Sequence, residues 1–227
     1  MDIHLYLCEV PPPDDRVPAL IGRLGAEERV RAERFAVDPA RFAYAAAHAL
    51  LRRALDRASA GPRDWAFALN PFGKPSLDPP VGDIRFNLSH ADSLVAVALA
   101  RGAEIGVDVE ALRSAPDEAT FAGIVLAPEE EAELAGSDDR PARLMRLWVA
   151  KEAVAKAIGM GLSLPPKAIV LRGEAPEVAR LPGEHGAASD WWLHTERLPG
   201  HWLALAARAP QCRIVRESVT IDQLLEG

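Results

Sequence analysis

The sequence predicts an α+β fold built from two similar halves. Short alternating apolar segments, typical of β-strands, are separated by two long stretches in which apolar residues recur at helical spacing. The order of one strand, one long helix and several further strands occurs twice along the 227 residues, with no long linker in between. We therefore expect halves of residues 1–104 and 105–227, each an antiparallel sheet packed on a long helix, with a cleft between them.

The first half is predicted to start with a strand and to contain one long helix. Asp38-Pro39 has the composition of an N-cap and a first-turn proline, and apolar residues at helical spacing continue to about Ala58. Two later β-type segments are joined only by the tight link 90–92, which predicts a hairpin. The expected elements are a strand at 3–7, helices at 26–35 and 38–58, and strands at 65–69, 84–89 and 93–100.

The second half repeats this order. It opens with the β-type segment IGVDVE, and its long helix is expected to end at Gly159, a typical C-terminal stop. The expected elements are a strand at 105–110, a short helix at 127–134, a long helix at 140–159, and strands at 168–173, 190–197 and 201–208.

Composition and charge argue against several classes of protein. The net charge of −7 opposes general nucleic-acid binding, which needs a basic surface. No run of 18 apolar residues occurs, so no membrane span is expected, and the N-terminus lacks the features of a signal peptide. The two cysteines, Cys8 and Cys212, are therefore expected as reduced thiols in a cytoplasmic protein.

The segment IGVDVE places two carboxylates on one strand face. Side chains alternate along a strand, so Asp108 and Glu110 point to the same side, about 7 Å apart along the chain. Such a pair forms half of a site for a hard cation such as Mg²⁺. The alternative is an exposed strand with two hydrated acids.

The helix segment LWVAKEAVAKAIGMGL adds a third acid and a cation. Glu152 and Lys156 are four residues apart, so they are neighbours on one helix face. The positions around them are mostly Ala and Val, which predicts a largely buried face, and a buried acid needs a metal or the lysine as its partner. An ordinary surface Glu–Lys pair is the alternative. If this face meets Asp108 and Glu110, three carboxylates form a Mg²⁺ site beside a lysine.

Two segments of the first half carry polar groups. Lys74, one of only four lysines in the chain, lies in the predicted turn FGKP, and Ser89 and His90 end the segment FNLSH. Ser89 and His90, together with Asp92, invite a hydrolase interpretation. However, adjacent strand residues point to opposite faces, and Ser89 lacks the sharp turn of a nucleophile. We expect His90 either to contact an anion or to serve the local structure.

The ordered set FNLSHADSLVAVAL, IGVDVE and LWVAKEAVAKAIGMGL resembles the Sfp-type 4′-phosphopantetheinyl transferases. The similarity covers nearly the whole chain, including GKP and RAERF…DPARF…LLRRAL. The resemblance implies a pseudo-twofold α+β fold with coenzyme A and Mg²⁺, or Mn²⁺ in its place, between the halves. It also implies transfer of 4′-phosphopantetheine from coenzyme A to a serine of an acyl or peptidyl carrier protein, with release of adenosine 3′,5′-bisphosphate.

The resemblance further assigns roles to residues. It implies that Asp108, Glu110 and Glu152 hold the metal, and that Glu152, Lys156 and Asp108 are the catalytic groups. Lys156 is expected to stabilise the leaving phosphate, while Glu152 or its rival Glu130 is the base. The residues expected to contact coenzyme A are Arg31, Arg34, Arg41, Lys74, Ser89, His90, Asp108, Lys151 and Lys156. Gly106 is expected to leave room for the nucleotide or for neighbouring backbone.

Three positions depart from the family's pattern. Glu28 and Arg29 stand near a position where relatives often carry lysine, so that phosphate contact is not expected here. Val149 replaces a frequent Thr or Ser, and Pro39 occupies a usually non-proline position that a first helical turn accepts.

Two other functions use the same residues. One is a Mg²⁺-dependent phosphohydrolase acting on a free nucleotide, and the other is an inactive coenzyme A-binding or scaffold protein. The pathway of the carrier, whether polyketide, non-ribosomal peptide, siderophore or fatty-acid synthesis, is left open. The internal duplication favours a monomer, with no nucleic-acid or membrane partner.

Overall fold

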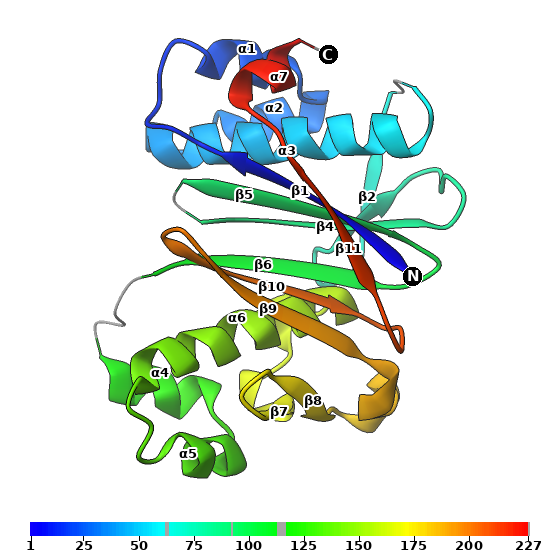
Figure 1. The fold of residues 1–227 in the computed structure, drawn as a ribbon. Coiled ribbons are helices and arrows are strands. Elements are labelled where there is room, and N and C mark those ends of the chain that lie inside the picture. The colour runs from blue at the N-terminus through cyan, green and yellow to red at the C-terminus, as the bar shows by residue number, and fades with distance from the viewer. Residues whose placement is uncertain (62–63, 92, 113–116, 227) are drawn as a thin grey trace.

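Four layers make up the protein, in the order helix, sheet, sheet, helix (Figure 1). The computed structural model describes residues 1–61, 64–91, 93–112 and 117–226; Asp92, part of the predicted hairpin link, lies outside these ranges. The strands are β1 (Asp2–Glu9), β2 (Phe67–Leu69), β3 (Pro75–Leu77), β4 (Ile84–Ala91), β5 (Leu94–Arg101), β6 (Ile105–Ala111), β7 (Val170–Arg172), β8 (Glu177–Arg180), β9 (Trp192–Leu198), β10 (His201–Ala207) and β11 (Arg213–Ser218). The α-helices are α1 (Val17–Gly22), α2 (Ala26–Ala32), α3 (Asp38–Ala58), α4 (Glu118–Val125), α5 (Pro128–Leu134), α6 (Arg140–Ile158) and α7 (Ile221–Leu225).

The strand order repeats between the halves. One sheet has the order β11-β1-β5-β4 and the other the order β6-β10-β9. In each half the first strand, β1 or β6, pairs antiparallel with the last, β5 or β10, which in turn pairs with the strand before it, β4 or β9. A long helix, α3 or α6, follows the first strand in both cases. The predicted α+β fold and its repeated topology are confirmed.

Alternating side chains explain how the two sheets pack. Ile105, Val107 and Val109 point from β6 into a core shared with β1, β5 and β10, where they meet residues such as Leu5 and Leu205. The other face of each sheet is covered by its own long helix, whose Ala- and Leu-rich side forms a second and a third apolar cluster. Gly106, Asp108 and Glu110 therefore face α6, because alternate residues of a strand point to opposite sides.

The ends of the long helices follow local signals. The N-cap of α3 is Val37 and Asp38 is its first helical residue, so the cap lies one position earlier than predicted. Helix α6 ends as predicted, with Gly159 in the left-handed region at a φ of 88°. Short elements such as α1, α4, β3 and β8 were not predicted from the periodicity.

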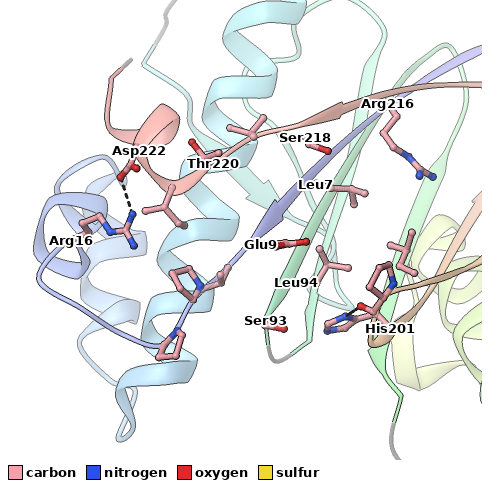
Figure 2. Close-up of a pocket in the computed structure, with 17 residues that line it drawn as sticks. Leu7, Glu9, Arg16, Ser93, Leu94, His201, Arg216, Ser218, Thr220 and Asp222 are labelled. Atoms are coloured by element: carbon pink, nitrogen blue, oxygen red, sulfur yellow. Dashed lines mark hydrogen bonds and ion pairs between the residues drawn. The ribbon is translucent and has the colours of Figure 1, made fainter.

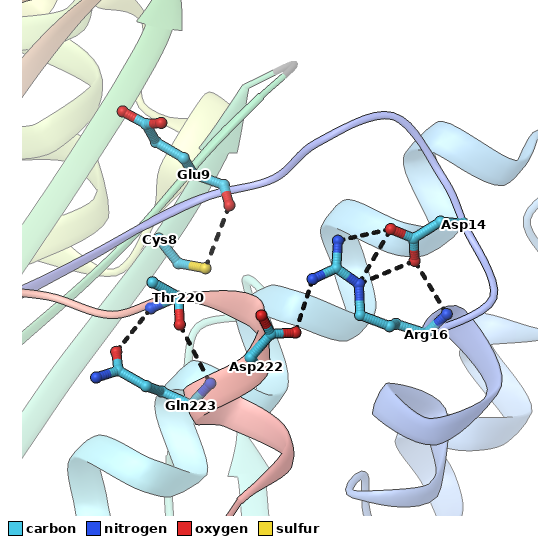
Figure 3. A network of polar contacts seen from close by, with 7 residues as sticks. All are labelled: Cys8, Glu9, Asp14, Arg16, Thr220, Asp222 and Gln223. Carbon is cyan, nitrogen blue, oxygen red and sulfur yellow. Dashed lines mark hydrogen bonds and ion pairs between the residues drawn. The ribbon is translucent and has the colours of Figure 1, made fainter.

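The C-terminal residues return to the first half. Strand β11 pairs in parallel with β1, where Asp2 lies opposite Arg213, and so extends the sheet of the first half. Helix α7 then packs beside α1 and α3 (Figure 1). Arg16 donates to Asp222 at 2.8 Å, and Thr220 caps α7 by accepting from the Gln223 amide (Figure 3). The packing unit of the second half therefore ends before β11, whereas we expected it to run to residue 227.

Two expectations about the environment can be compared with the structure. Cys8, which is buried, and Cys212, which is partly buried, are both free thiols, and burial raises the pKa of Cys8 to about 12. Among the described residues, none of the helices combines the length and the apolar character that crossing a membrane requires.

Candidate active site

The edges of the two sheets meet at β4 and β6. On β4, Asn87 and Ser89 are buried and point toward β6. The Asn87 Oδ1 atom accepts from the Val107 amide at 2.9 Å, and Ser89 Oγ accepts from the Val109 amide at 3.3 Å. Side chains of one strand thus bond to the backbone of the other. This junction brings the strand with the paired acids against the FNLSH segment.

Three predicted residues converge at this junction. The Lys156 Nζ atom lies 2.6 Å from Asp108 Oδ1 and 2.9 Å from Ser89 Oγ, and Ser89 Oγ donates to Asp108 Oδ1 at 2.9 Å. Asp108 is buried, whereas the side chain of Lys156 is 25% exposed. Strands β4 and β6 and helix α6 each contribute one residue, so the cluster exists only when both halves are folded together.

A glycine allows α6 to approach this closely. A Cβ atom added at Gly106 would lie 2.0 Å from the Ala153 carbonyl oxygen and 2.5 Å from the Ala157 amide nitrogen. Any side chain there would push α6 away from β6. Of the two roles expected for Gly106, the structure shows the approach of neighbouring backbone.

The two remaining acids line the same face. Glu152 lies one turn before Lys156 on α6 and is 8% exposed. Burial raises the pKa of Glu152 to about 7, helped by the negative charges of Asp108 and Glu110 and opposed by Lys156. Glu110 Oε1 accepts from the Trp148 indole at 3.0 Å. The three acids therefore lie along α6 within electrostatic reach of one another.

The donor set suits a divalent cation, although no complete cage is formed. Within the described ranges, no group of three or more His, Cys, Asp or Glu side chains is close enough to hold a metal ion. However, Asp108 Oδ2 is buried without a hydrogen-bond partner among the same residues, and burial, followed by the negative charge of Asp108, raises the pKa of Glu152. Mg²⁺ commonly uses only one or two protein carboxylates, and takes its other ligands from water and phosphate. Asp108 and Glu152 meet that requirement.

Lys151 and Glu130 lie away from the β4–β6 junction, in the core of the second half. Both are 1% exposed, and Lys151 Nζ donates to Glu130 Oε2 at 2.5 Å and to the Val125 carbonyl at 2.7 Å. Glu130 also accepts from the amides of Ala127 and Leu171, each at 2.8 Å. All these bonds lie inside the second half. The structure therefore does not support the expected contact of Lys151 with coenzyme A or the role of Glu130 as base, because burial and internal bonds occupy both groups.

Lys74 is also bound within the chain. Its Nζ atom donates to Glu104 Oε2 at 2.8 Å, to the Ala157 carbonyl at 2.8 Å and to the Ile105 carbonyl at 3.3 Å. An ammonium has three donors, so all three are used. Burial lowers the pKa of Lys74, which Glu104 partly offsets. The structure thus places this lysine between the halves and leaves it no donor for a phosphate.

His90 and Arg41 lie outside the cluster of Asp108, Ser89 and Lys156. His90 follows Ser89 on β4 and reaches solvent, and its pKa is lowered by desolvation of the imidazole and by the nearby charges of Lys156 and His48. On the first turn of α3, Arg41 Nε is buried and has no hydrogen-bond partner among the described residues. The Arg41 guanidinium therefore favours an anion as its partner, whereas the lowered pKa of His90 favours a neutral imidazole, which can still donate one hydrogen bond.

Arg31 and Arg34 line a separate cavity of about 720 Å³, together with apolar residues such as Val30 and Leu69. The Arg31 guanidinium also lies 5.7 Å from the centre of the Tyr44 ring. None of the residues of the β4–β6 junction lines this cavity. The two arginines are therefore not brought to Asp108 and Lys156.

Glu28 has a structural role that the sequence did not reveal. It is 8% exposed, and its carboxylate lies 2.7 Å from His48 Nδ1 and accepts from the Gly25 amide and from Arg52 Nε. These partners lower the pKa of Glu28 to about 2, against the effect of burial. The acid thus ties α2 to α3, which explains how the chain accommodates it.

A larger cavity, of about 870 Å³, lies away from the residues of the β4–β6 junction. It opens between the ends of β1, β5 and β11 and the β9–β10 turn, and residues including Leu7, Leu94, His201 and Arg216 line it (Figure 2). None of the predicted site residues belongs to its lining. The cavity therefore gives no support to a catalytic role at that end of the sheets.

Two residues of the junction region were given no role on the basis of the sequence. Asn87 joins β4 to β6, and Asn70 Nδ2 donates to the Gly159 carbonyl at 2.8 Å. Asn87 and Ser89 stand two apart on a strand that is otherwise largely apolar, which was an available signal. Asn70 offers no comparable signal beyond its place in a turn.

Several known proteins are similar to this chain. Residues 104–206 match the family model of the 4′-phosphopantetheinyl transferase superfamily. The chain is 30% identical to the 4′-phosphopantetheinyl transferase homologue slr0495 of Synechocystis sp. strain PCC 6803 over 219 residues, which cover 89% of this chain and 86% of the relative. It is 28% identical to 4′-phosphopantetheinyl transferase Sfp of Bacillus subtilis strain 168, over 71% of each chain. A crystal structure of holo-[acyl-carrier-protein] synthase from Neisseria meningitidis matches 46% of this chain and 95% of its own length, with 28% identity and a TM-score of 0.41. This chain belongs to the 4′-phosphopantetheinyl transferase superfamily.

Proposed function

We propose that this enzyme transfers 4′-phosphopantetheine from coenzyme A to a serine of an apo acyl or peptidyl carrier protein. The serine oxygen forms a bond to the β-phosphorus of coenzyme A, and the bond from that phosphorus to the bridging oxygen breaks. Adenosine 3′,5′-bisphosphate leaves with the bridging oxygen, and the serine proton passes to a base. Catalysis of such a step rests on positioning and on stabilising charge at the phosphate oxygens.

One observation carries the proposal. Asp108, Ser89 and Lys156 meet at the junction of two sheets, beside a Glu152 whose pKa burial raises to about 7. A lysine and paired acids at one site suit a substrate that is a phosphate anion rather than a neutral molecule. In a member of this superfamily, that substrate is coenzyme A.

Asp108 and Glu152, with Glu110 alongside, would hold a Mg²⁺ ion, for which Mn²⁺ could substitute. When bound there, the cation supplies Lewis-acid stabilisation of charge on the pyrophosphate oxygens. The buried Asp108 Oδ2 atom, which has no hydrogen-bond partner in the described part of the chain, supports this assignment.

Glu152 is the proposed base and Lys156 the proposed stabiliser of the leaving phosphate. A base works best when its pKa is near the working pH, and in the absence of a bound cation burial brings the pKa of Glu152 to about 7. The Lys156 side chain is partly exposed, so its ammonium can turn from Asp108 toward an incoming phosphate. Glu130 has no such access, because it is bonded inside the core.

The remaining contacts with coenzyme A are proposed for Ser89, His90 and Arg41, with Arg31 and Arg34 farther out. The buried Arg41 Nε atom has no hydrogen-bond partner among the described residues and favours an anion, and a neutral His90 imidazole can donate one hydrogen bond to a phosphate oxygen. We expect Arg41→Ala to weaken coenzyme A binding at least tenfold in titration calorimetry while leaving the free energy of unfolding nearly unchanged. An unchanged affinity would remove Arg41 from the site.

The proposed partner is a carrier-protein domain, and the proposed working form is a cytoplasmic monomer. Residues 1–104 and 105–227 would act as one unit, since the cluster of Asp108, Ser89 and Lys156 already contains residues from both. Free thiols at Cys8 and Cys212 are consistent with a reducing compartment. Nucleic-acid and membrane partners are not part of the proposal.

Intact-mass analysis of an apo carrier protein, incubated with this enzyme, coenzyme A and Mg²⁺, tests the function. We expect the carrier to gain one phosphopantetheine arm, and chelation of the metal to stop the gain. Asp108→Ala and Glu152→Ala provide matched inactive variants. Release of phosphate without a carrier would instead indicate a phosphohydrolase, and coenzyme A binding without any transfer would indicate an inactive binding protein.

A further inference from the structure

We propose that Asn70 and Lys74, in the β2–β3 turn of the first half, are positioning residues that set the last turn of α6 for catalysis. This inference rests on the proposed function, because it concerns the placement of Glu152 and Lys156. It replaces a direct contact of Lys74 with coenzyme A by an indirect role.

The turn that carries these residues is ordered by its own hydrogen bonds. Asn70 Oδ1 accepts from the amides of Phe72 and Lys74 at 2.9 and 2.8 Å. The backbone N–H of Asn70 donates to the Lys74 carbonyl at 3.0 Å. Gly73 has a φ of 87°, which a glycine adopts without strain. One asparagine therefore holds both ends of the turn and leaves its Nδ2 group directed outward.

That turn binds the end of a helix from the other half. Asn70 Nδ2 donates to the Gly159 carbonyl at 2.8 Å, and Lys74 Nζ donates to the Ala157 carbonyl at 2.8 Å. The last carbonyls of a helix have no partner within the helix and carry its negative partial charge. An ammonium and an amide from the first half thus complete the end of α6.

The same ammonium also holds the start of β6. Lys74 Nζ reaches the Ile105 carbonyl at 3.3 Å and Glu104 Oε2 at 2.8 Å. Strand β6 and helix α6 touch at Gly106, where an added Cβ would clash with the backbone of Ala153 and Ala157. Lys74 therefore fixes the two elements relative to each other at the point of their closest approach.

The catalytic cluster begins at the residue next to Ala157, whose carbonyl Lys74 binds. Lys156 precedes Ala157, and Asp108 lies three residues after Ile105 on β6. A shift of α6 along β6 would separate Lys156 Nζ from Asp108 Oδ1, now 2.6 Å apart. A misplacement of about 1 Å at a reacting group can lower a rate about 100-fold, so the clamp formed by Asn70 and Lys74 affects the rate of transfer.

Lys74→Met separates this role from a phosphate contact, because Met keeps the apolar stem and removes the ammonium. We expect kcat to fall about 10- to 100-fold, while the KM for coenzyme A and the calorimetric affinity for adenosine 3′,5′-bisphosphate change less than about threefold. A KM or product affinity weakened tenfold or more with kcat retained would overturn the inference and restore the phosphate contact. Lys167→Met, which removes an ammonium that bonds neither α6 nor the turn among the described residues, is the control.

Asn70→Asp gives an independent test with a smaller change. The Asp oxygen still accepts from Phe72 and Lys74, but the donor to Gly159 is lost. We expect a lower kcat and faster hydrogen exchange of the amides at residues 155–160, with the β4–β5 hairpin unchanged. Unchanged exchange there would overturn the clamp, even if Lys74→Met did not fold. The exchange measurement does not require activity, so a wild-type enzyme that fails to load a carrier would contradict the proposed function alone.

Discussion

Gly106 on β6 and Ala153 on α6 are in direct backbone contact: a Cβ atom added at Gly106 would lie 2.0 Å from the Ala153 carbonyl oxygen. Because the opposing atoms belong to backbone, they cannot rotate away as a flexible side chain would. The contact sets the distance between the strand that carries Asp108 and the helix that carries Lys156.

Replacing Gly106 with alanine should destabilise the protein. We expect a loss of about 1–3 kcal/mol in the free energy of unfolding, the usual cost of overpacking, and a lower transfer rate because α6 moves. Denaturant unfolding and carrier loading measure the two effects. Gly123→Ala is the control, since a Cβ at this helical glycine meets no heavy atom within 4 Å and alanine favours a helix. Equal stability of the two variants would contradict the tight contact at Gly106.

The stability of the metal-free enzyme should depend on the protonation of Glu152. Burial raises the pKa of Glu152 from 4.5 to about 7, so the folded state holds this proton more strongly than the unfolded state. The corresponding stability is present below pH 4.5 and is lost as the pH rises through 7. The free energy of unfolding of Glu152→Gln should therefore exceed that of the wild type by on the order of 2 kcal/mol at pH 8. The difference should be much smaller at pH 5.

Thermal or denaturant unfolding at the two pH values tests this expectation. A gain that is the same at pH 5 and pH 8 would show that the pKa of Glu152 is not raised. Added Mg²⁺ should stabilise the wild type at pH 8 but not the Gln variant, because a cation that binds only the folded state shifts the unfolding equilibrium.

Loss of Lys156 should affect stability and activity separately. Lys156→Met leaves the Asp108 carboxylate buried with Ser89 as its one side-chain donor among the described residues, and we expect a cost of about 1–3 kcal/mol at pH 8. Adding Asp108→Asn should recover much of that stability, because a neutral amide needs no cation. Transfer should stay at least 100-fold below wild type in both variants. Normal carrier loading by Lys156→Met would exclude the lysine from the reaction.

Glu130→Gln distinguishes a core residue from a base. Its carboxylate bonds Lys151 and the amides of Ala127 and Leu171 in a site that is 1% exposed. Removing the charge leaves Lys151 buried without a counterion, at a cost of about 3–5 kcal/mol. Per folded molecule, we expect kcat and its pH profile to remain close to wild type. A 100-fold loss of kcat without loss of stability would instead make Glu130 the base.

Should that single variant not fold, Glu130→Gln combined with Lys151→Met removes both charges. Replacing a whole buried pair costs less than breaking it. The same activity measurement on the double variant then decides between Glu130 and Glu152.

Local patterns were sufficient for much of the fold. The proline and helical spacing after Asp38 and the stop at Gly159 correctly bounded the long helices within a residue. Alternation in IGVDVE correctly assigned opposite faces to Val107 and Asp108. These features depend on neighbours in the sequence, which is why they can be read without a structure.

Contacts between distant segments required the folded chain. Strand β11 pairs with β1 across more than 200 residues, and no local signal marks such a partner. Lys151 and Lys156 stand five residues apart, about 140° around a helix axis, so α6 can direct only one of them to Asp108. Packing against β6 chose Lys156 and left Lys151 to Glu130. Residue types thus reveal which chemistry is available, while burial and the approach of β6 to α6 select the groups that can meet, because pKa values and hydrogen bonds depend on distance in space.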